Sequence, residues 1–571
     1  MVIFKMFYNL NKYFEKIREF LQNKSNIKNF KLHNKKYLRK SKGSSNSKIL
    51  VEFNSFTSNH VIISKLVNFY SNKFDSEIIS FFNYSLVSSP AYFGFKRSIK
   101  WYLGSFLSLS FFSIYKSFNV KKFIRPKFSK QIKNEAIKIF DNIKNDLKSN
   151  EDVLKIKIKN IFVGDLILDG YMFHKRIPRV NFEDGNFNKY LYEFILIFLF
   201  WDKYFKLNKV KAVIGVHATY AYGIIFRIVV SKEIDAILNF GGKVHRLTKN
   251  NIYQNSEFKL FKKVFDTFSV SEKNKAIEIS NHFLKKRFEG KTSAEINEYR
   301  ITTSPFSTPY DKNISVLNKS DKLKVIIFPH ELNDCSNGQG LNFFPDYVTW
   351  LETLVEISKN TDYEWYAKNH PQFKGKFEKY QPYSHKLAES IFDKNPNIKI
   401  LPSETSHHQI IGEGIDFGLT VNGDVAYEYA YHGIPILTAT KNCNTSVYNF
   451  NIHSENRDDY VKKIKNLKNI KINNIDKRSV LECYFMMDIY FGELNLLENY
   501  YDFIKKNKKN LFYDTYFTTA IYSELLNNWS DVKQENLETT FKEFIDSKDY
   551  ILSCKHSKKS ITDLIKTYQK K

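Results

Sequence analysis

The sequence is poor in cysteine and has no long hydrophobic run. Its four cysteines lie far apart and none forms a Cys-x-x-Cys pair, which excludes a disulfide scaffold and a zinc ribbon and favours a reducing cytoplasm. The apolar run Phe194–Trp201 (FILIFLFW) has eight residues, whereas about 20 are needed to cross a bilayer. Serines and Lys116 interrupt the second apolar stretch, Trp101–Phe118. We therefore expect a cytoplasmic protein without a secretory signal, in which both stretches pack in a core or lie against a membrane surface.

Acidic residues are also scarce, because 60 Asp and Glu face 88 Lys and Arg, giving a formal net charge of +28. Such a surplus attracts nucleic acid, an anionic membrane or an anionic substrate. The density of Lys and Arg is highest in residues 5–43 and in Lys555–Lys571. These ends are either arms that bind a membrane surface, such as the inner membrane, or nucleic acid, or they are solvated, partly helical termini. No zinc-finger spacing or RNA-binding motif occurs, so nucleic acid is not an expected partner.

Hydrophobic residues make up 43% of the 571 positions, which is enough for more than one buried core and excludes wholesale disorder. Two series of alternating strand and helix patterns predict an α/β fold with parallel sheets. In the first series we expect strands at Lys48–Phe53, Glu77–Phe82, Asn160–Leu168, Val210–Val216 and Ala236–Phe240, and helices at Val61–Tyr70 and 189–207. In the second we expect strands at Leu323–Phe328, Glu364–Ala367, Ile398–Leu401, Asp416–Val421 and Pro435–Thr438, and helices at Asp346–Lys359, Ser406–Gly412 and Val425–His432.

This order predicts two Rossmann-type parallel-sheet domains that face each other across a cleft. The expected parts are a basic N-terminal arm (1–45), a first domain (46–300), a second domain (301–455) and a helical C-terminal region (456–571). Ligands of open α/β sheets bind at the carboxyl ends of the strands. Polar residues at or near such ends are Asp165, Asp169, His217, His330, Glu331, His370, Asn422 and Glu428.

Two segments of the second domain have patterns that suit a phosphorylated ligand. In Lys368-Asn369-His370-Pro371 the proline disfavours helix at His370, so a loop at a strand end presents an imidazole that can hold a phosphate or donate a proton. On its own, a His-Pro dipeptide also occurs in ordinary loops. In the segment from Leu419 to Pro435, Gly423 permits a close backbone approach, and the helix after it offers free amides to a phosphate. Glu428, near the start of that helix, could bind a ribose diol.

Together, with His370 and Glu428 58 positions apart, these segments resemble the donor-binding half of GT-B glycosyltransferases. More narrowly, they are similar to bacterial capsule and surface-polysaccharide glycosyltransferases with a His-Pro motif, which include the capsule Kdo-transferase and polysialyltransferase families. Phe162–Tyr171 (FVGDLILDGY) resembles the GDLIYD-x-Y segment of capsule-type enzymes, and His217–Arg227 loosely resembles a segment of their acceptor domain.

The resemblance implies a metal-independent GT-B enzyme without a cofactor, whose first domain binds a polysaccharide or glycolipid acceptor and whose second binds the donor. It would transfer a Kdo-type or sialic-acid-type sugar from a CMP-linked donor to a growing capsule or surface polysaccharide. Lys368 would contribute to donor binding, and His370 would contact the donor phosphate or protonate the departing CMP. Asn422, Gly423 and Asp424 would lie at the phosphate, with Glu428 at the nucleotide sugar. The families favour serines where this chain has Gly423 and Asp424, so a UDP-linked donor stays open.

The acceptor hydroxyl of a transferase needs a general base, or a nucleophile if the reaction retains configuration. Asp165 is the first candidate because it is expected near a strand end that faces the cleft. Asp169 and His217 follow, and Glu331 is the candidate from the second domain. Each could instead be a helix cap or a surface residue. No Asp-x-Asp pair follows a predicted strand, so no metal is expected.

Two other classes of function stay open. A non-enzymatic basic protein that binds nucleic acid or an anionic polymer would need a continuous basic surface. A GT-B-like sugar-nucleotide epimerase would need acid and base groups on both faces of the sugar. A transferase would need His370, Glu428 and a carboxylate of the first domain to converge on one cleft, and this is the function that the sequence favours.

Overall fold

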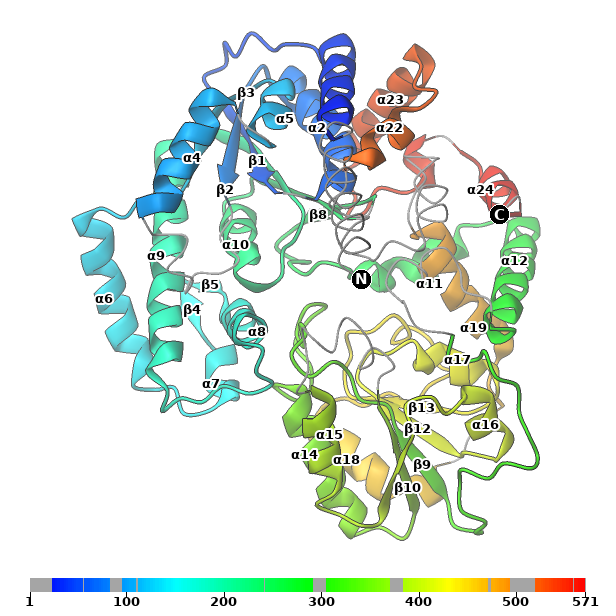
Figure 1. Ribbon diagram of the computed structural model, residues 1–571. Helices are drawn as coiled ribbons and strands as arrows, with labels where there is room; N and C mark the ends of the chain where they lie inside the picture. The colour runs from blue at the N-terminus through cyan, green and yellow to red at the C-terminus, as the bar shows by residue number, and fades with distance from the viewer. Residues whose placement is uncertain are drawn as a thin grey trace, which may run out of the picture.

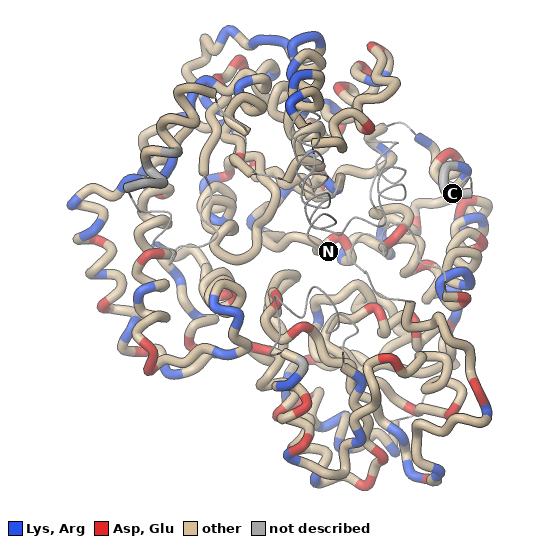
Figure 2. Tube along the Cα trace, viewed as in Figure 1, with Lys and Arg blue, Asp and Glu red and all other residues tan. Residues whose placement is uncertain are grey.

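The computed structural model describes most of the chain between residues 23 and 569 (Figure 1). The residues within these limits that it does not describe are 55, 83–94, 109–110, 241, 291–303, 370–383, 471–473, 493–518 and 558. His370 and Pro371 of the predicted His-Pro motif therefore lie outside the described residues, as do residues 1–22 of the predicted basic arm. Lys and Arg are distributed over both halves of the molecule (Figure 2).

The first half of the chain forms a six-stranded sheet with the order β3-β2-β1-β6-β7-β8. Its strands are β1 (Lys48–Phe53), β2 (Glu77–Phe82), β3 (Val120–Ile124), β6 (Val210–Gly215), β7 (Asp235–Phe240) and β8 (Lys243–Leu247). Neighbouring strands are parallel except for β7 and β8. Residues of β1 alternate between two cores, since Ile49 and Val51 pack on one face and Leu50 on the other. Helices cover both faces, which explains why β1, in the middle of the sheet, has apolar residues on both faces.

The elements between and beside these strands are mostly helical. They are α2 (Thr57–Phe74), α4 (Phe95–Leu107), α5 (Phe111–Ser117), α6 (Lys130–Lys144), α7 (Asn150–Leu154), β4 (Lys157–Ile158), β5 (Ile161–Phe162), α8 (Gly164–Lys175), α9 (Gly185–Leu207), η1 (Tyr220–Tyr222) and α10 (Gly223–Ser231). The helix α2 packs on one face of the sheet, and α8, α9 and α10 pack on the other. The run Phe194–Trp201 lies in α9 and is part of the core. No helix within the described residues is long and apolar enough to cross a membrane.

The second half forms a five-stranded parallel sheet with the order β11-β10-β9-β12-β13. Its strands are β9 (Lys324–Ile327), β10 (Glu364–Lys368), β11 (Ile398–Leu401), β12 (Phe417–Thr420) and β13 (Ile436–Thr438). Its helices are α14 (Tyr347–Lys359), α15 (Ser384–Phe392), α16 (His407–Gly412), α17 (Val425–Tyr431), α18 (Arg457–Lys465) and the short η4 (Leu467–Asn469). Val325 and Ile327 pack in the core on one face, and Ile326 packs on the other.

The predicted α/β class with two parallel-sheet, Rossmann-type domains is therefore confirmed, and both sheets share one topology. In each, the first strand is central, the second and third lie on one side of it, and the fourth and fifth lie on the other. The strand order thus reverses between β1 and β6 in the first sheet and between β9 and β12 in the second. Such a switch point opens a crevice at the carboxyl ends of its two strands, where α/β proteins bind ligands.

A further core joins the end of the predicted first domain to the C-terminal helices (Figure 1). It is built from η2 (Glu257–Leu260), α11 (Phe261–Asp266), α12 (Val270–Phe288), α19 (Lys477–Tyr484), the π-helix η5 (Phe485–Tyr490) and α24 (Ile561–Gln569), with residues of α17. Residues 257–288 thus pack with helices from the C-terminal region, although the sequence pattern predicts that they belong to the first domain.

The chain then returns to the first domain through α22 (Ala520–Leu526), α23 (Asp531–Ser547) and η6 (Cys554–Ser557). Tyr522 and Phe541 belong to the core around α2. Residues 23–37 of the predicted basic arm form a helix that packs on the same elements, since Phe30 stacks on Tyr522 with 4.3 Å between ring centroids. Residues 23–37, α22 and α23 therefore complete the first domain.

The predicted strand at Asn160–Leu168 is wrong. Only Ile161–Phe162 is extended, as β5, and α8 begins at Gly164. The sequence pattern did not reveal this helix, because it is buried on nearly all sides. Its residues therefore lack the polar face that produces the helical periodicity of apolar residues. Gly164 fits because a Cβ atom there would lie 2.4 Å from the carbonyl oxygen of Val153.

Candidate functional site

The loops that follow the central strands of the two sheets contact each other. The Tyr220 hydroxyl of η1, which follows β6, donates a hydrogen bond of 2.7 Å to Asp334 Oδ1 in the loop after β9. In the same loop, a Cβ atom on Gly338 would lie 3.6 Å from Thr219 Cγ2 of the first domain. The carboxyl ends of both sheets therefore point toward one another, and the polar residues at these ends are the candidate site.

Asp169, a predicted catalytic residue, joins the two domains. It lies in α8, and its carboxylate accepts hydrogen bonds from Ser336 Oγ (2.9 Å), from the backbone N–H and side-chain Nδ2 of Asn337 (2.9 and 3.0 Å) and from Cys335 Sγ (3.3 Å). Burial raises the pKa of Asp169 to about 7, against the bonds from Asn337, which lower it. Both oxygens are occupied, so this carboxylate holds the loop after β9 in place.

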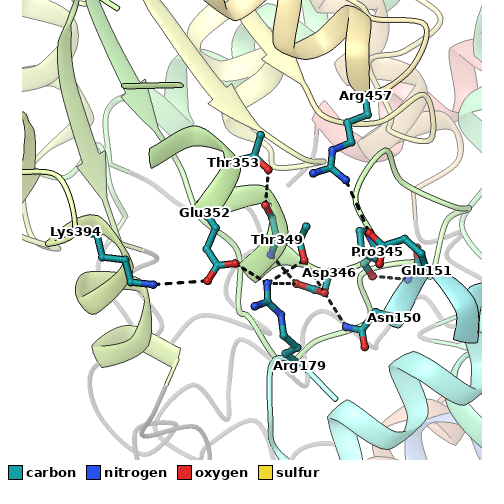
Figure 3. Close-up of polar contacts among 11 residues, drawn as sticks. Asn150, Glu151, Arg179, Pro345, Asp346, Thr349, Glu352, Thr353, Lys394 and Arg457 are labelled. Atoms are coloured by element: carbon teal, nitrogen blue, oxygen red, sulfur yellow. Dashed lines mark hydrogen bonds and ion pairs between the residues drawn. The ribbon is translucent and has the colours of Figure 1, made fainter. Parts of the chain in front are cut away.

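A second group of contacts fixes the same interface farther from the sheets (Figure 3). Asp346, the N-cap of α14, accepts a hydrogen bond of 2.7 Å from Asn150 Nδ2. Arg179 Nη2 donates to Glu352 Oε2 (2.8 Å) and to Thr349 Oγ1 (3.0 Å). These bonds fix the first turns of α14, and they thereby also fix the end of the loop between β9 and α14.

Asp165, the first candidate for a general base, does not lie at a strand end. It is in the first turn of α8 and is buried, and its Oδ2 accepts a hydrogen bond of 2.5 Å from Arg227 Nη2. Burial raises the pKa of Asp165, and Arg227 opposes this rise. Arg227 also bonds to the carbonyl oxygen of Phe162. This arrangement suits a structural ion pair that fixes α8 on α10.

His217 lies directly after β6, at the switch point of the first sheet. Its ring packs against Phe240, with 4.4 Å between ring centroids, and near Phe56 and Tyr222. Burial lowers the pKa of His217 to about 4, so the imidazole is neutral at pH 7. A neutral imidazole at a strand end can accept a proton or hold a polar ligand group.

His330 lies just beyond the end of β9, at the switch point of the second sheet between β9 and β12. Its Nε2 accepts hydrogen bonds from the backbone N–H groups of Val421 and Asn422, both at 3.2 Å. Burial lowers the pKa of His330 to about 4, against the charge of Asp424. Because Nε2 is an acceptor, the ring proton of the neutral imidazole is on Nδ1, which makes Nδ1 a hydrogen-bond donor.

The bonds to His330 change the predicted role of the Asn422–Asp424 loop. The backbone N–H of Asn422 is occupied by the imidazole rather than left free for a phosphate. Gly423 packs against the same region, since a Cβ atom there would lie 3.0 Å from Thr420 Oγ1 and 3.6 Å from His330 Cε1. The helix that follows, α17, has only seven residues. Asn422 and Gly423 thus shape the switch point by positioning His330.

Glu331 is the predicted catalytic residue whose surroundings best suit proton exchange. Its Oε1 accepts a hydrogen bond from Ser384 Oγ, while its buried Oε2 has no hydrogen-bond partner among the described residues. Burial is the main cause that raises the pKa of Glu331 to about 7. A carboxyl group that titrates near neutral pH can act as an acid or a base.

Lys368 is the last residue of β10 and is 3% exposed. Its ammonium group has no hydrogen bond or ion pair with the described residues. Burial lowers its pKa to about 8, against the attraction of Glu428. The next residue, Asn369, is also buried, and its Oδ1 has no partner among the described residues. His370 follows immediately but is not described, so its predicted role stays a prediction.

Glu428 and Asp424 share a cation that the sequence did not suggest. Arg287, at the end of α12, is buried and donates from Nε to Glu428 Oε1 at 2.5 Å. Its Nη2 lies 3.5 Å from Asp424 Oδ2. Arg287 and Glu428 are 141 positions apart in sequence, and no motif surrounds Arg287. This ion pair explains why an acidic residue is tolerated after Gly423.

The structure thus brings Lys368, Asn422, Gly423, Asp424, Glu428 and Glu331 to one edge of the second sheet. His217, from the first domain, lies at the edge that faces it. Asp165 instead forms an ion pair with Arg227, and Asp169 forms the contact between the two domains. Within the described part of the chain, no group of three or more His, Cys, Asp or Glu side chains could hold a metal ion.

Neither a family model nor a curated protein matches this sequence. Among solved structures, the chain is similar to UDP-GlcNAc 2-epimerase of Methanocaldococcus jannaschii in complex with UDP-GlcNAc and UDP, at 13% identity over 77% of this chain and 98% of that one, with a TM-score of 0.24. A putative UDP-N-acetylglucosamine 2-epimerase of Listeria monocytogenes gives 12% identity over 76% and 93%, with a TM-score of 0.22. The S. aureus MnaA–UDP structure gives 12% identity over 88% and 97%, with a TM-score of 0.17. At these identities and scores the likeness carries no argument about activity.

Proposed function

We propose that the chain is an enzyme that acts on a nucleotide-activated sugar, whose phosphates bind beside Lys368 at the carboxyl edge of the second sheet. The observation that carries the proposal is the buried side chain of Lys368, which forms no hydrogen bond or ion pair with the described residues and whose pKa is lowered to about 8 by burial. A buried cation without a partner costs free energy, and an anionic ligand would offset that cost. The edge of an open α/β sheet near its switch point is where such ligands bind.

The neighbouring groups fit the remaining parts of such a ligand. His330 presents Nδ1–H as a donor, because both backbone bonds are accepted by Nε2. Glu428, held by Arg287, is the predicted contact for the nucleotide sugar. Glu331, with its unbonded Oε2 and a pKa near 7, exchanges a proton with the substrate more readily than Asp165, which is paired with Arg227, or Asp169, whose two oxygens accept hydrogen bonds from the loop after β9.

For the reaction itself, the sequence resemblance favours transfer of a CMP-linked sugar to a polysaccharide or glycolipid acceptor. In that reaction His370 protonates the departing nucleotide and Glu331 or His217 takes the proton of the acceptor hydroxyl. A second candidate is a sugar-nucleotide epimerase. It is favoured by Glu331 of the second domain, whose carboxyl group has a pKa of about 7, and by the neutral imidazole of His217 of the first domain, which together supply an acid and a base from opposite domains.

The binding site is tested with CMP, CDP, UDP and GDP by thermal denaturation and calorimetry. A nucleotide at 100 times its dissociation constant adds about 2.7 kcal/mol to the free energy of unfolding. Lys368→Met should weaken binding about tenfold or more, because a charge-assisted contact is lost. Lys399→Met is the control, since Lys399 is an exposed residue of β11 in the same sheet. Equal binding by wild type and Lys368→Met would disprove the proposed site.

The reaction is tested by incubating the enzyme with the CMP- or UDP-linked sugar whose nucleotide binds. An epimerase changes the configuration of the sugar while the nucleotide remains attached, and it needs no acceptor. A transferase releases one nucleotide for each sugar transferred and depends on an acceptor. Analysis of the products by NMR distinguishes the two reactions, and the absence of both with every donor that binds would contradict the enzyme proposal.

A further inference from the structure

A helix of the first domain exposes an unusual number of large apolar side chains. In α4 these are Ile99, Tyr102, Leu103, Phe106 and Leu107, and they recur every three or four positions. Residues at this spacing form one stripe along a helix. Phe106 is 82% exposed and Leu107 is 55% exposed, so the stripe faces away from the protein.

The opposite side of α4 packs against the first sheet. Trp101 lies 5.3 Å from Phe53, 5.2 Å from Phe82 and 5.0 Å from Phe112, measured between ring centroids. Gly104 lets the helix approach closely, since a Cβ atom there would lie 2.6 Å from Phe112 Cε2. The orientation of α4 is therefore fixed by its buried side. Phe53 and Phe82 end β1 and β2, so α4 lies at the carboxyl edge of the first sheet.

The charges around this stripe have one sign. Residues 78–134, which include α4, contain ten Lys and Arg and no Asp or Glu. All charged residues in the described part of this segment are therefore basic (Figure 2). The Arg125 guanidinium lies 5.3 Å and the Lys127 ammonium 5.4 Å from the centroid of the Tyr102 ring. Lys121 and Lys122 of β3 are also exposed. Cations thus border the apolar stripe.

We propose that the outer face of α4 docks on an anionic lipid bilayer. An amphipathic helix that lies in the interface inserts large apolar side chains among the lipid chains, while nearby cations meet the anionic headgroups. The apolar stripe of α4 and the basic residues of β3 and its flanks supply both parts. A second copy of the chain would bring the same positive charges together, which opposes self-association through this face. Docking turns the carboxyl edge of the first sheet toward the bilayer.

The experiment measures binding of the full chain to vesicles by co-sedimentation. Binding should be strong with equal parts of phosphatidylcholine and phosphatidylglycerol and weak with phosphatidylcholine alone, and salt should weaken it. The double variant Leu103→Ser/Phe106→Ser should lower the partition coefficient about tenfold or more, because apolar contact with the lipid is lost. Lys121→Glu/Lys122→Glu should also lower it. The melting temperature of both variants should stay that of the wild type, because these side chains are exposed.

Matched controls use exposed residues elsewhere. Leu207→Ser changes an apolar side chain that is 72% exposed at the end of α9, and Lys262→Glu/Lys263→Glu changes two exposed lysines of α11. Both should bind vesicles like the wild type. Equal losses in controls and test variants would overturn the proposal. Vesicle binding that persists in both the α4 and the β3 variants but is lost when residues 2–22 are deleted would also overturn it. An α4 variant that dissociates a dimer and leaves vesicle binding unchanged would do the same.

Discussion

At the scale of single residues, burial shifts the pKa of two groups toward neutrality at one edge of the second sheet. It lowers the pKa of Lys368 to about 8 and raises that of Glu331 to about 7. Neither group has the partner that normally offsets such burial, because Lys368 has no ion pair among the described residues and Glu331 Oε2 has no hydrogen bond there. Both residues therefore lower the stability of the folded protein, which is typical of residues that bind a ligand.

The variant Glu331→Gln tests the pKa of this carboxyl group. The ordinary pKa of 4.5 applies to the unfolded chain and a value of about 7 to the folded chain. The folded state therefore holds the proton more tightly, and this stabilisation is lost as pH rises from 4.5 through 7. Glutamine cannot titrate, so wild type should lose up to about 3 kcal/mol relative to the variant across this range. Urea denaturation at several pH values measures the difference.

The control for this measurement is Glu356→Gln, which changes an exposed glutamate on α14 that pairs with Lys359. Its difference from wild type should stay below about 1 kcal/mol and vary little with pH. A wild-type protein whose stability follows that of Glu331→Gln at every pH would show that the carboxyl of Glu331 titrates normally.

The sequence predicted part of the candidate site. Residues that follow a strand, such as His217, Glu331 and Lys368, could be recognised because the end of a parallel strand is visible in a pattern of apolar residues. His330 was visible as a strand-end residue, but its tautomer depends on the backbone N–H groups of Val421 and Asn422, 91 and 92 positions away. Arg287 could not be found, because its pairing with Glu428 exists only in the folded chain.

At the scale of elements, local sequence patterns predicted correctly those strands and helices whose structure follows from their own residues. The strands Lys48–Phe53 and Glu77–Phe82 were predicted with their observed bounds, and the N-cap Ser406 marks the start of α16 as expected. The failure is α8, whose residues are apolar on nearly every side. Such a segment reads as a strand, because its structure is decided by packing against α7 and η1 rather than by its own pattern.

The close contact between α7 and α8 can be tested at Gly164. In Gly164→Ala the new Cβ atom would lie 2.4 Å from the carbonyl oxygen of Val153 and 2.6 Å from the carbonyl carbon of Leu154. Because backbone atoms cannot rotate away, α7 and α8 must separate, and the free energy of unfolding should fall by about 1–3 kcal/mol. Chemical denaturation followed by circular dichroism measures this loss.

Gly185→Ala is the matched control for this change. Gly185 is the first residue of α9, and a Cβ atom there meets no atom within 4 Å. Alanine favours helix over glycine by up to about 1 kcal/mol, so this variant should be as stable as wild type or slightly more stable. A loss of equal size in both variants would contradict the packing argument.

At the scale of the whole molecule, two cores are shared between distant parts of the chain. The first domain is completed by residues 23–37 and by α22 and α23, while α12 and α24 pack together beside the second domain. The predicted division into consecutive segments therefore describes the two sheets but not the helices around them. No local pattern reveals this exchange, because the surfaces that meet are hundreds of residues apart in sequence.

Truncation after residue 518 should loosen the first domain and, because it also removes α24, the helix α12, but not the second sheet. It removes Tyr522, Phe541 and Phe544 from the core around α2, so backbone amides of α2, β7 and β8 should exchange hydrogen faster while those of β9 and β10 keep their protection. Hydrogen–deuterium exchange with mass spectrometry measures each segment. Truncation after residue 557 is the control, since it removes α24 and should affect α12 instead. Uniform loss of protection in both proteins would contradict the assignment of cores.

The return of the chain to its starting domain constrains the order in which a ribosome can produce a finished fold. The strands of the second sheet end at Thr438, so that sheet can assemble while the remainder is still being synthesised. The first domain emerges earlier but lacks Tyr522 and Phe541 until residues well beyond the second sheet have been translated. During this interval its core around α2 is exposed to water. We therefore expect the part made first to be the part that matures last.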